Sequence, residues 1–172
     1  MSRRDVTLSK ADRARLGAHY TPPELAKVMC ARGLQPLLTW PHAMQCSGCD
    51  PSLAITNMLV IDPACGDGVF LHAAADLLGE LLWEAYQVEG IACERDEARA
   101  RIVYNVLVGV DIDPGAIQLC QASLPGADLT CADALLDWRL DTEGRPTAFV
   151  GNPPFMGGGK ISGHLGAAYP KR

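Results

Sequence analysis

From Met58 onward, short apolar runs alternate with longer segments of helical character. The runs at 59–61, 106–112, 129–132 and 147–150 have the length of buried strands, and helices are expected at 70–82, 96–105 and 116–123. Short apolar strands that alternate with helices are typical of a parallel sheet. The pattern therefore predicts an α/β fold, a doubly wound Rossmann-like sheet that is partial, with about four parallel strands.

The segment before Met58 has a different pattern. A helix is predicted to begin with Thr21 as its N-cap, Pro22 at its first position and Glu24 closing a capping box. Gly33 is its expected end. The expected apolar face of this helix consists of Leu25, Val28 and Met29. We interpret residues 1–57 as an N-terminal helical segment and connector with room for one more short helix, and 58–172 as the partial α/β domain.

Composition narrows the class of protein. The chain has 172 residues, 48% of them hydrophobic, and a net charge of −5. This balance argues for one folded domain and against a basic nucleic-acid surface covering most of the chain. No apolar run is long enough to span a membrane, and no secretory signal is present, so we expect no membrane partner and a cytoplasmic location.

Seven cysteines at irregular spacing do not form a disulfide framework, and they suit a reducing compartment. Cys46 and Cys49 form a single CxxC pair, which is half a zinc site. Cys30 and His42 could complete four ligands, but two free thiols in a loop is the simpler interpretation. We therefore expect no metal.

Polar residues and a glycine turn lie at the ends of the predicted strands. They are Asp62, the turn glycines Gly66 and Gly68, Asp111, Asp133 and Asn152. Ligands of open α/β sheets bind along the carboxyl ends of the strands, at the point where the strand order reverses. We therefore expect these residues to line one crevice.

Three features of this crevice, the glycine turn, Asp111 and Asp133, suit a cofactor that contains adenosine. A glycine turn between strand and helix lets a ligand approach the backbone, although Leu71 replaces the third glycine of GxGxxG and the Lys of a P-loop is absent. Asp111 can accept from ribose hydroxyls, while Asp113 caps the following helix. Asp133 can accept from an adenine amino group.

The tetrapeptide Asn152-Pro153-Pro154-Phe155 is the most specific signal. Its prolines restrict the loop, and the Asn152 oxygen and a proline carbonyl can accept from one amino group. Phe155 offers a face on which a planar ring can stack. The alternative interpretation is a proline-rich turn.

Taken in order, four motifs resemble the N6-adenine DNA methyltransferases with the gamma order of motifs. They are residues 17–23 (GAHYTPP), 62–68 (DPACGDG), 111–114 (DIDP) and 152–155 (NPPF). The resemblance covers about residues 17–165, and the segment 155–163 resembles large single-chain methylases of restriction and phage-defence systems. Asp67 departs from the family, in which Ser is common at this position.

The resemblance implies a methyltransferase fold and S-adenosylmethionine (SAM) as cofactor. Tyr20 and Thr21 fall where the family contacts the methionine end of SAM. Asp62, Gly66 and Gly68 match the SAM-binding turn. Asp111, with its neighbour Ile112, matches the acid that binds the ribose, and Asp133 matches the acid that binds the adenine.

The resemblance also implies the reaction. Asn152, Pro153, Pro154 and Phe155 match the catalytic tetrapeptide. A target adenine flipped out of double-stranded DNA would stack on Phe155, and its N6 would donate to Asn152 Oδ1 and the Pro153 carbonyl before direct methyl transfer. A methyltransferase for protein glutamine or an RNA base, and a non-catalytic SAM-binding module, are the alternatives; the Tyr-Thr-Pro segment favours DNA.

The family fold has seven strands, and four are predicted here. We therefore expect the rest of the methylase domain and a DNA-recognition domain to follow residue 172. Subunits of a restriction or defence system are the other expected partners. Residues 1–172 alone are expected to methylate DNA poorly or not at all, because a net charge of −5 gives little attraction to phosphate.

Overall fold

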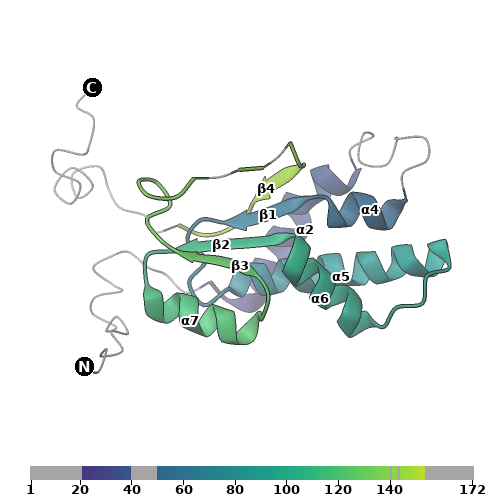
Figure 1. Cartoon of the computed structure of the whole chain (residues 1–172), viewed down its shortest axis with the longest axis horizontal. Coiled ribbons are helices and arrows are strands. Elements are labelled where there is room, and N and C mark those ends of the chain that lie inside the picture. The colour runs from purple at the N-terminus through teal and green to yellow at the C-terminus, as the bar shows by residue number, and fades with distance from the viewer. Residues whose placement is uncertain (1–20, 40–49, 140, 143, 154–172) are drawn as a thin grey trace.

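The computed structural model describes residues 21–39, 50–139, 141–142 and 144–153. Its centre is a parallel sheet of four strands in the order β3-β2-β1-β4. The strands are β1 (Leu59–Asp62), β2 (Leu107–Asp111), β3 (Asp128–Cys131) and β4 (Thr147–Phe149). All four predicted strands are therefore confirmed, and the fold is α/β and compatible with a Rossmann-like arrangement (Figure 1).

Five helices accompany the sheet in the described part of the chain. They are α2 (Pro23–Thr39), α4 (Pro51–Thr56), α5 (Val69–Glu89), α6 (Arg95–Asn105) and α7 (Pro114–Ser123). The three helices predicted after Met58 are confirmed as α5, α6 and α7, and α4 is the short helix for which the connector had room. None of the helices in the described part of the chain is both long and apolar enough to cross a membrane.

The described helices share one core with one face of the sheet. Neighbours in register point to the same side of a parallel sheet, and successive residues point to opposite sides. Val60, Leu107 and Ala148 are in register and belong to the core that contains side chains of α2, α5, α6 and α7. Helices on the opposite face, which a doubly wound sheet requires, are not among the described residues.

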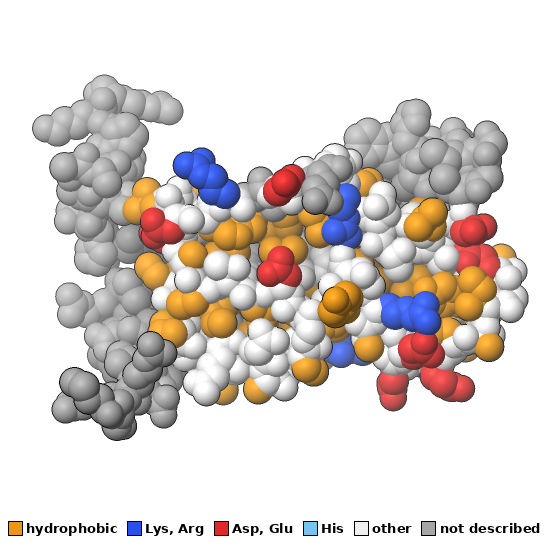
Figure 2. Space-filling view, in the orientation of Figure 1, with side chains coloured by type: hydrophobic (Ala, Val, Ile, Leu, Met, Phe, Trp, Pro, Cys, Tyr) orange, Lys and Arg blue, Asp and Glu red, His pale blue; other side chains and the backbone are white. Residues whose placement is uncertain are grey.

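The opposite face of the sheet is apolar. Ile61 is in register with Val108 and Phe149 on that face, and Phe149 is 60% exposed. In the space-filling view, hydrophobic side chains are visible over the strands (Figure 2). The sheet thus has one face covered by helices and one face that remains partly open.

Helix α2 differs from its prediction in three ways. It begins at Pro23, because the Pro22 carbonyl accepts from the amides of Leu25 and Ala26, so Thr21 is not the N-cap. Glu24 pairs with Lys27 at 3.2 Å instead of closing a capping box. The helix also continues through Gly33 and Pro36 to Thr39. Gly33 faces open space, so nothing there requires the helix to end.

The predicted apolar face of α2 is wrong. Leu25, Val28 and Met29 are 50%, 49% and 42% exposed. The buried stripe consists of Ala26, Cys30 and Leu34, at a spacing of four residues. Two of these side chains are small, which lets α2 pack closely on α5. Cys30 donates to the Phe70 carbonyl of α5 at 3.5 Å, and burial raises the pKa of this thiol to about 11.

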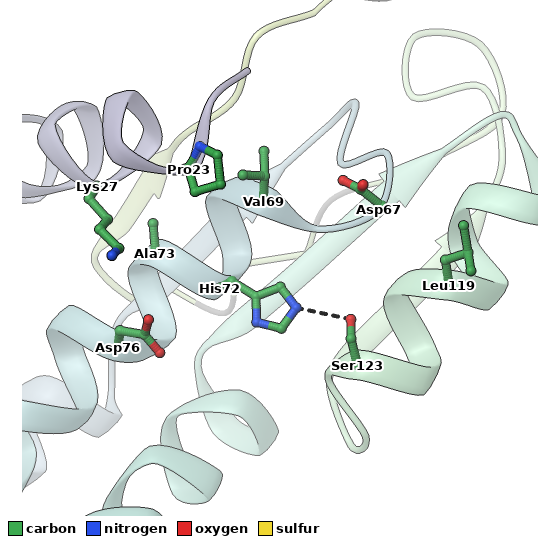
Figure 3. Close-up of a pocket in the computed structure, with 9 residues that line it drawn as sticks. All are labelled: Pro23, Lys27, Asp67, Val69, His72, Ala73, Asp76, Leu119 and Ser123. Carbon is green, nitrogen blue, oxygen red and sulfur yellow. Dashed lines mark hydrogen bonds between the residues drawn. The ribbon is translucent and has the colours of Figure 1, made fainter. Parts of the chain in front are cut away.

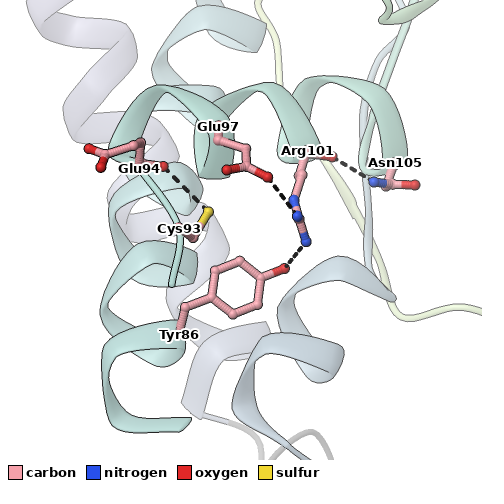
Figure 4. Close-up of polar contacts among 6 residues, drawn as sticks. All are labelled: Tyr86, Cys93, Glu94, Glu97, Arg101 and Asn105. Carbon is pink, nitrogen blue, oxygen red and sulfur yellow. Dashed lines mark hydrogen bonds and ion pairs between the residues drawn. The ribbon is translucent and has the colours of Figure 1, made fainter. Parts of the chain in front are cut away.

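Arginine side chains of α6 hold this helix against α5. Arg101 donates to the Tyr86 hydroxyl at 3.1 Å and to Glu97 at 2.7 Å, and its guanidinium lies 5.4 Å from the centre of the Tyr86 ring (Figure 4). Arg95 pairs with Glu80 and lies 3.9 Å from the centre of the Trp83 ring. These contacts are partly exposed, so they orient α6 more than they stabilise it.

One arginine connects the segments at the amino ends of the strands. Arg145 precedes β4, and its Nη2 donates to the carbonyls of Met58 at 2.8 Å and Asn105 at 2.6 Å. Weaker bonds reach the carbonyls of Thr56 and Asn57, at 3.3 and 3.2 Å. We call Arg145 and these four carbonyls the Arg145 cluster. It joins the ends of α4 and α6 to the starts of β1 and β4.

Candidate functional site

The strand order reverses between β1 and β4. The chain runs outward from β1 to β2 and β3 and then returns to the other side of β1 as β4. In open α/β sheets this switch point is where ligands bind, at the carboxyl ends of the strands. Asp62 ends β1 there, and Asn152 follows β4, so the structure brings these two predicted residues to the same place.

The glycine turn after β1 is held to β2. The amide of Gly66 donates to Asp111 Oδ2 at 2.8 Å, and the amide of Cys65 donates to the Val110 carbonyl. Gly66 has φ +55° and Gly68 has φ +94°, in the left-handed region that favours glycine. A Cβ on Gly68 would lie 2.6 Å from Cys120 Sγ of α7. Gly68 is therefore required both for the turn and for its packing on α7.

Asp111 joins two segments and keeps accepting capacity. Besides Gly66, it accepts from the Asp113 amide at Oδ1, at 2.9 Å. Each carboxylate oxygen has a second acceptor site, and the side chain is half-buried, so hydroxyl groups of a ligand could still donate to it. Asp113 in turn accepts from the Gly115 amide at 2.9 Å, which confirms its predicted role as the cap of α7.

Asp62 is a buried carboxyl group with one unused oxygen. It is 1% exposed, and its Oδ1 accepts from the Ala64 amide at 3.1 Å. Its Oδ2 is buried without a hydrogen-bond partner among the described residues. Burial raises the pKa of Asp62 to about 7; the Ala64 amide opposes this rise, and the charge of Asp111 adds to it. Such an oxygen suits a cationic or hydrogen-donating ligand group.

The loop after β4 packs directly on Asp62. Gly151 has φ +140°, and a Cβ at this position would lie 2.5 Å from Asp62 Oδ1. Asn152, the next residue, is exposed, but its Nδ2 donates to Thr21 Oγ1 at 3.2 Å. Thr21 is 5% exposed. This bond between residues 131 positions apart brings the segment before α2 to the crevice.

Asp133 is bound locally. It lies two residues after β3, and its Oδ1 accepts from the amides of Leu135 at 2.9 Å and Leu136 at 3.2 Å. In the described part of the chain, no hydrogen bond joins its side chain to the other predicted site residues. Its segment is still tied to β2, because the Ala132 amide donates to the Asp111 carbonyl. Ile112, the neighbour of Asp111, is 63% exposed.

Several predicted site residues lie outside the described residues: Tyr20, Pro154, Phe155 and the possible metal ligands His42, Cys46 and Cys49. Within the described ranges, no group of three or more His, Cys, Asp or Glu side chains could hold a metal ion. Pro153 is described and exposed.

A pair of buried thiols under the glycine turn escaped the sequence analysis. Cys65 and Cys120 are both buried and free. Their mutual hydrogen bond raises the pKa of Cys65 and lowers the pKa of Cys120. These thiols fill the space between the turn and α7.

A separate pocket of about 500 Å³ opens between α2, α5 and α7. Figure 3 shows its lining residues: Pro23, Lys27, Asp67, Val69, His72, Ala73, Asp76, Leu119 and Ser123. Ser123 Oγ lies 2.9 Å from His72 Nε2, which resembles a nucleophile beside its base.

The hydrogen bonds of His72 exclude a role for this residue as the general base that activates Ser123. Arg99 Nη2 lies 3.3 Å from His72 Nδ1, and because a guanidinium can only donate, Nδ1 must accept. Neutral His72 therefore carries its proton on Nε2 and donates to Ser123, whose hydroxyl donates to the Cys120 carbonyl at 3.1 Å. Burial, and then the Arg99 charge, lower the pKa of His72. The pair is a structural hydrogen-bond chain and offers no base to Ser123.

The chain has no match among known protein-family models or curated protein sequences.

Proposed function

We propose that this chain is the cofactor-binding part of a SAM-dependent DNA methyltransferase that acts on the N6 amino group of adenine. The observation that carries the proposal is the meeting of separate sequence motifs at one sheet edge. Asn152 bonds to Thr21, Gly66 bonds to Asp111, and Gly151 packs on Asp62. The proposal assigns the sheet to the doubly wound Rossmann-like methyltransferases, a class with helices on both faces.

The side chains of the crevice fit this cofactor. SAM is a cation with ribose hydroxyls and an adenine amino group. Asp62 Oδ2 is buried without a partner in the described part of the chain, and an unsatisfied acid there favours a cationic or donating group. Asp111 retains acceptor sites for hydroxyls, and Asp133 Oδ2 remains for an amino group. When bound, SAM would supply an electrophilic methyl group.

The Asn152 loop can hold the amine that receives the methyl group. Because Nδ2 of Asn152 donates to Thr21, its Oδ1 is left to accept a hydrogen bond. Pro153 has no N–H and can offer only its carbonyl oxygen. Two acceptors around one exocyclic amine fix both N–H bonds and orient the nitrogen lone pair. Their contribution is positioning and electrostatics, without a covalent step on the protein.

The proposal leaves most DNA contacts to a recognition domain or to subunits of a restriction or defence system. With a net charge of −5, this chain offers little attraction to phosphate. The five described cysteines are free thiols, which suits the cytoplasm where such systems act.

Calorimetric titration with SAM tests the cofactor assignment. We expect Asp111→Ala to weaken binding by about 10- to 150-fold, since hydrogen bonds to a charged acceptor contribute about 1.5–3 kcal/mol. Asp128→Ala, an exposed aspartate at the amino end of β3, is the matched control and should bind like wild type. A wild-type chain that does not bind SAM, or an Asp111→Ala chain that binds normally, contradicts the assignment.

The reaction is tested with protein expressed from the intact gene. Transfer of tritiated methyl groups to mixed genomic DNA should yield N6-methyladenine, and Asn152→Ala should abolish it with SAM binding largely intact. Label in RNA or in glutamine of protein instead would identify the alternative substrates. SAM binding without transfer to any of these substrates would indicate a non-catalytic module.

A further inference from the structure

The hydrogen bond between Thr21 and Asn152 suggests a role for Thr21 that its sequence position does not show. Thr21 is 5% exposed, whereas Asn152 is exposed and has this one side-chain bond to a described residue, at 3.2 Å. The two residues lie 131 positions apart. A buried hydroxyl therefore holds an amide that is otherwise open to the crevice.

An asparagine side chain needs such a partner to act in one orientation. Its amide has an acceptor oxygen and a donor nitrogen on the same carbon, and rotation about the terminal torsion exchanges them over a broad range. An amine substrate needs the oxygen, because an NH2 group facing it would be repelled. With Nδ2 donating to Thr21 Oγ1, Oδ1 is directed away from Thr21, where it can accept from the substrate.

The position of Thr21 is itself well determined. Two prolines follow it, and α2 begins at the second one, Pro23. Ala26, Cys30 and Leu34 anchor that helix in the core. Thr21 thus presents its hydroxyl from a segment with little backbone freedom.

We propose that Thr21 is a positioning residue that orients the Asn152 amide so that Oδ1 faces the target amine. This inference rests on the proposed function. It differs from what the family resemblance implies, in which Thr21 contacts the methionine end of SAM. The two roles predict opposite results: a positioning role affects turnover, and a cofactor contact affects SAM affinity.

The hydrogen bond can be observed without any activity. In the ¹⁵N-labelled chain, the side-chain NH2 signals of Asn152 are assigned by their loss in Asn152→Asp. Thr21→Val should shift these signals and speed their exchange with water, whereas Thr21→Ser should leave them near their wild-type positions. Thr21→Ala serves as a second variant if valine disturbs folding. Unchanged Asn152 signals in the variants that lack the hydroxyl would overturn the inference.

Kinetics with protein from the intact gene test the role. Thr21→Val should lower kcat by roughly 10- to 100-fold, as expected for a misplaced reacting group, while the Kd for SAM stays within about twofold. Thr21→Ser should restore most of kcat. Thr56→Val is the control, because Thr56 ends α4 at the amino ends of the strands and contributes only its backbone carbonyl to the Arg145 cluster; kcat and the Kd for SAM should stay like those of wild type.

The outcomes separate the two proposals. A Thr21→Val enzyme with normal kcat, whether or not its SAM binding is weakened, overturns the positioning role alone. Wild-type protein that binds no SAM and transfers no methyl group overturns the proposed function and the catalytic part of this inference, while the Asn152 signals still report whether the bond exists.

Discussion

At the amino ends of the strands one guanidinium binds four backbone carbonyls, whereas at the carboxyl ends a buried carboxyl group keeps an oxygen without a described partner. Arg145 supplies the first arrangement and Asp62 the second. The carboxyl ends also hold three glycines with positive φ, Gly66, Gly68 and Gly151. One edge of the sheet thus stabilises the fold, and the other keeps an unused carboxylate oxygen and glycine turns that a ligand can approach closely.

The largest effect is expected at the amino edge. Arg145→Ala removes a charged donor from the Met58 and Asn105 carbonyls, and we expect the free energy of unfolding to fall by about 4 kcal/mol. Arg145→Lys should recover part of this loss. Urea denaturation measures it, with Arg32→Ala at an exposed site of α2 as control. If Arg145→Ala is no less stable than Arg32→Ala, the amino edge is not the stabilising one.

At the carboxyl edge, removal of a charged group should increase the free energy of unfolding. The pKa of Asp62 rises from 3.8 to about 7 on folding, so the folded state binds the extra proton between these values. Stability therefore falls as pH rises from about 4 to 7 and is level above 7. Asp62→Asn cannot ionise, so its free energy of unfolding does not fall in this way. It should exceed that of wild type by about 4 kcal/mol above pH 7, with little difference near pH 4.

This comparison is measured by denaturation of both proteins across that pH range. If the difference in free energy of unfolding between Asp62→Asn and wild type does not increase with pH, Asp62 is not held in its protonated form. The same pair sharpens the cofactor proposal, because a cationic ligand favours ionised Asp62. SAM affinity should then increase as pH rises through 7 in wild type and stay flat in Asp62→Asn.

Strain at Gly151 is expected to have a smaller effect. Gly151→Ala adds a Cβ at 2.5 Å from Asp62 Oδ1 and keeps φ at +140°, so we expect a loss of about 2 kcal/mol. The loss should shrink in an Asp62→Ala background, where the facing oxygen is gone. Gly33→Ala, in open space on α2, should be neutral or slightly stabilising. Equal losses in both backgrounds would place the strain in the backbone alone.

The smallest effect is expected at Asp113, which accepts from the Gly115 amide as the cap of α7. We expect Asp113→Ala to lower the free energy of unfolding by about 1 kcal/mol, because the helix loses its cap. Thermal unfolding of Asp113→Ala beside Asp128→Ala measures the difference. If the two variants are equally stable, the Asp113 cap does not stabilise α7.

The sequence was most informative where local pattern and burial agree. From β1 to β4 every element was predicted, since short apolar strands alternate there with longer helical segments. The positions of Asp62, Asp111 and Asn152 at the ends of strands also followed from the sequence, because parallel strands place their carboxyl ends at one edge.

Predictions failed where long-range packing decides. The large apolar residues of α2 indicated one face, but the neighbouring helix α5 accepts the stripe with small side chains, Ala26 and Cys30. Thr21 has the sequence context of an N-cap, and only the approach of the β4 loop reveals its bond to Asn152. Arg145 stands in an irregular segment without periodicity, so no local signal pointed to its four carbonyl partners.

The Arg145 cluster has a consequence for the order of folding. Arg145 lies 87 residues after Met58 and 40 after Asn105, so its contacts close long loops of the chain. The pairing of β1 with β4 is equally distant in sequence. Contacts of such high sequence separation form late and slow the folding of a domain. During synthesis, β1 and α5 leave the ribosome well before Arg145, and the amino edge of the sheet can be completed only when that residue arrives.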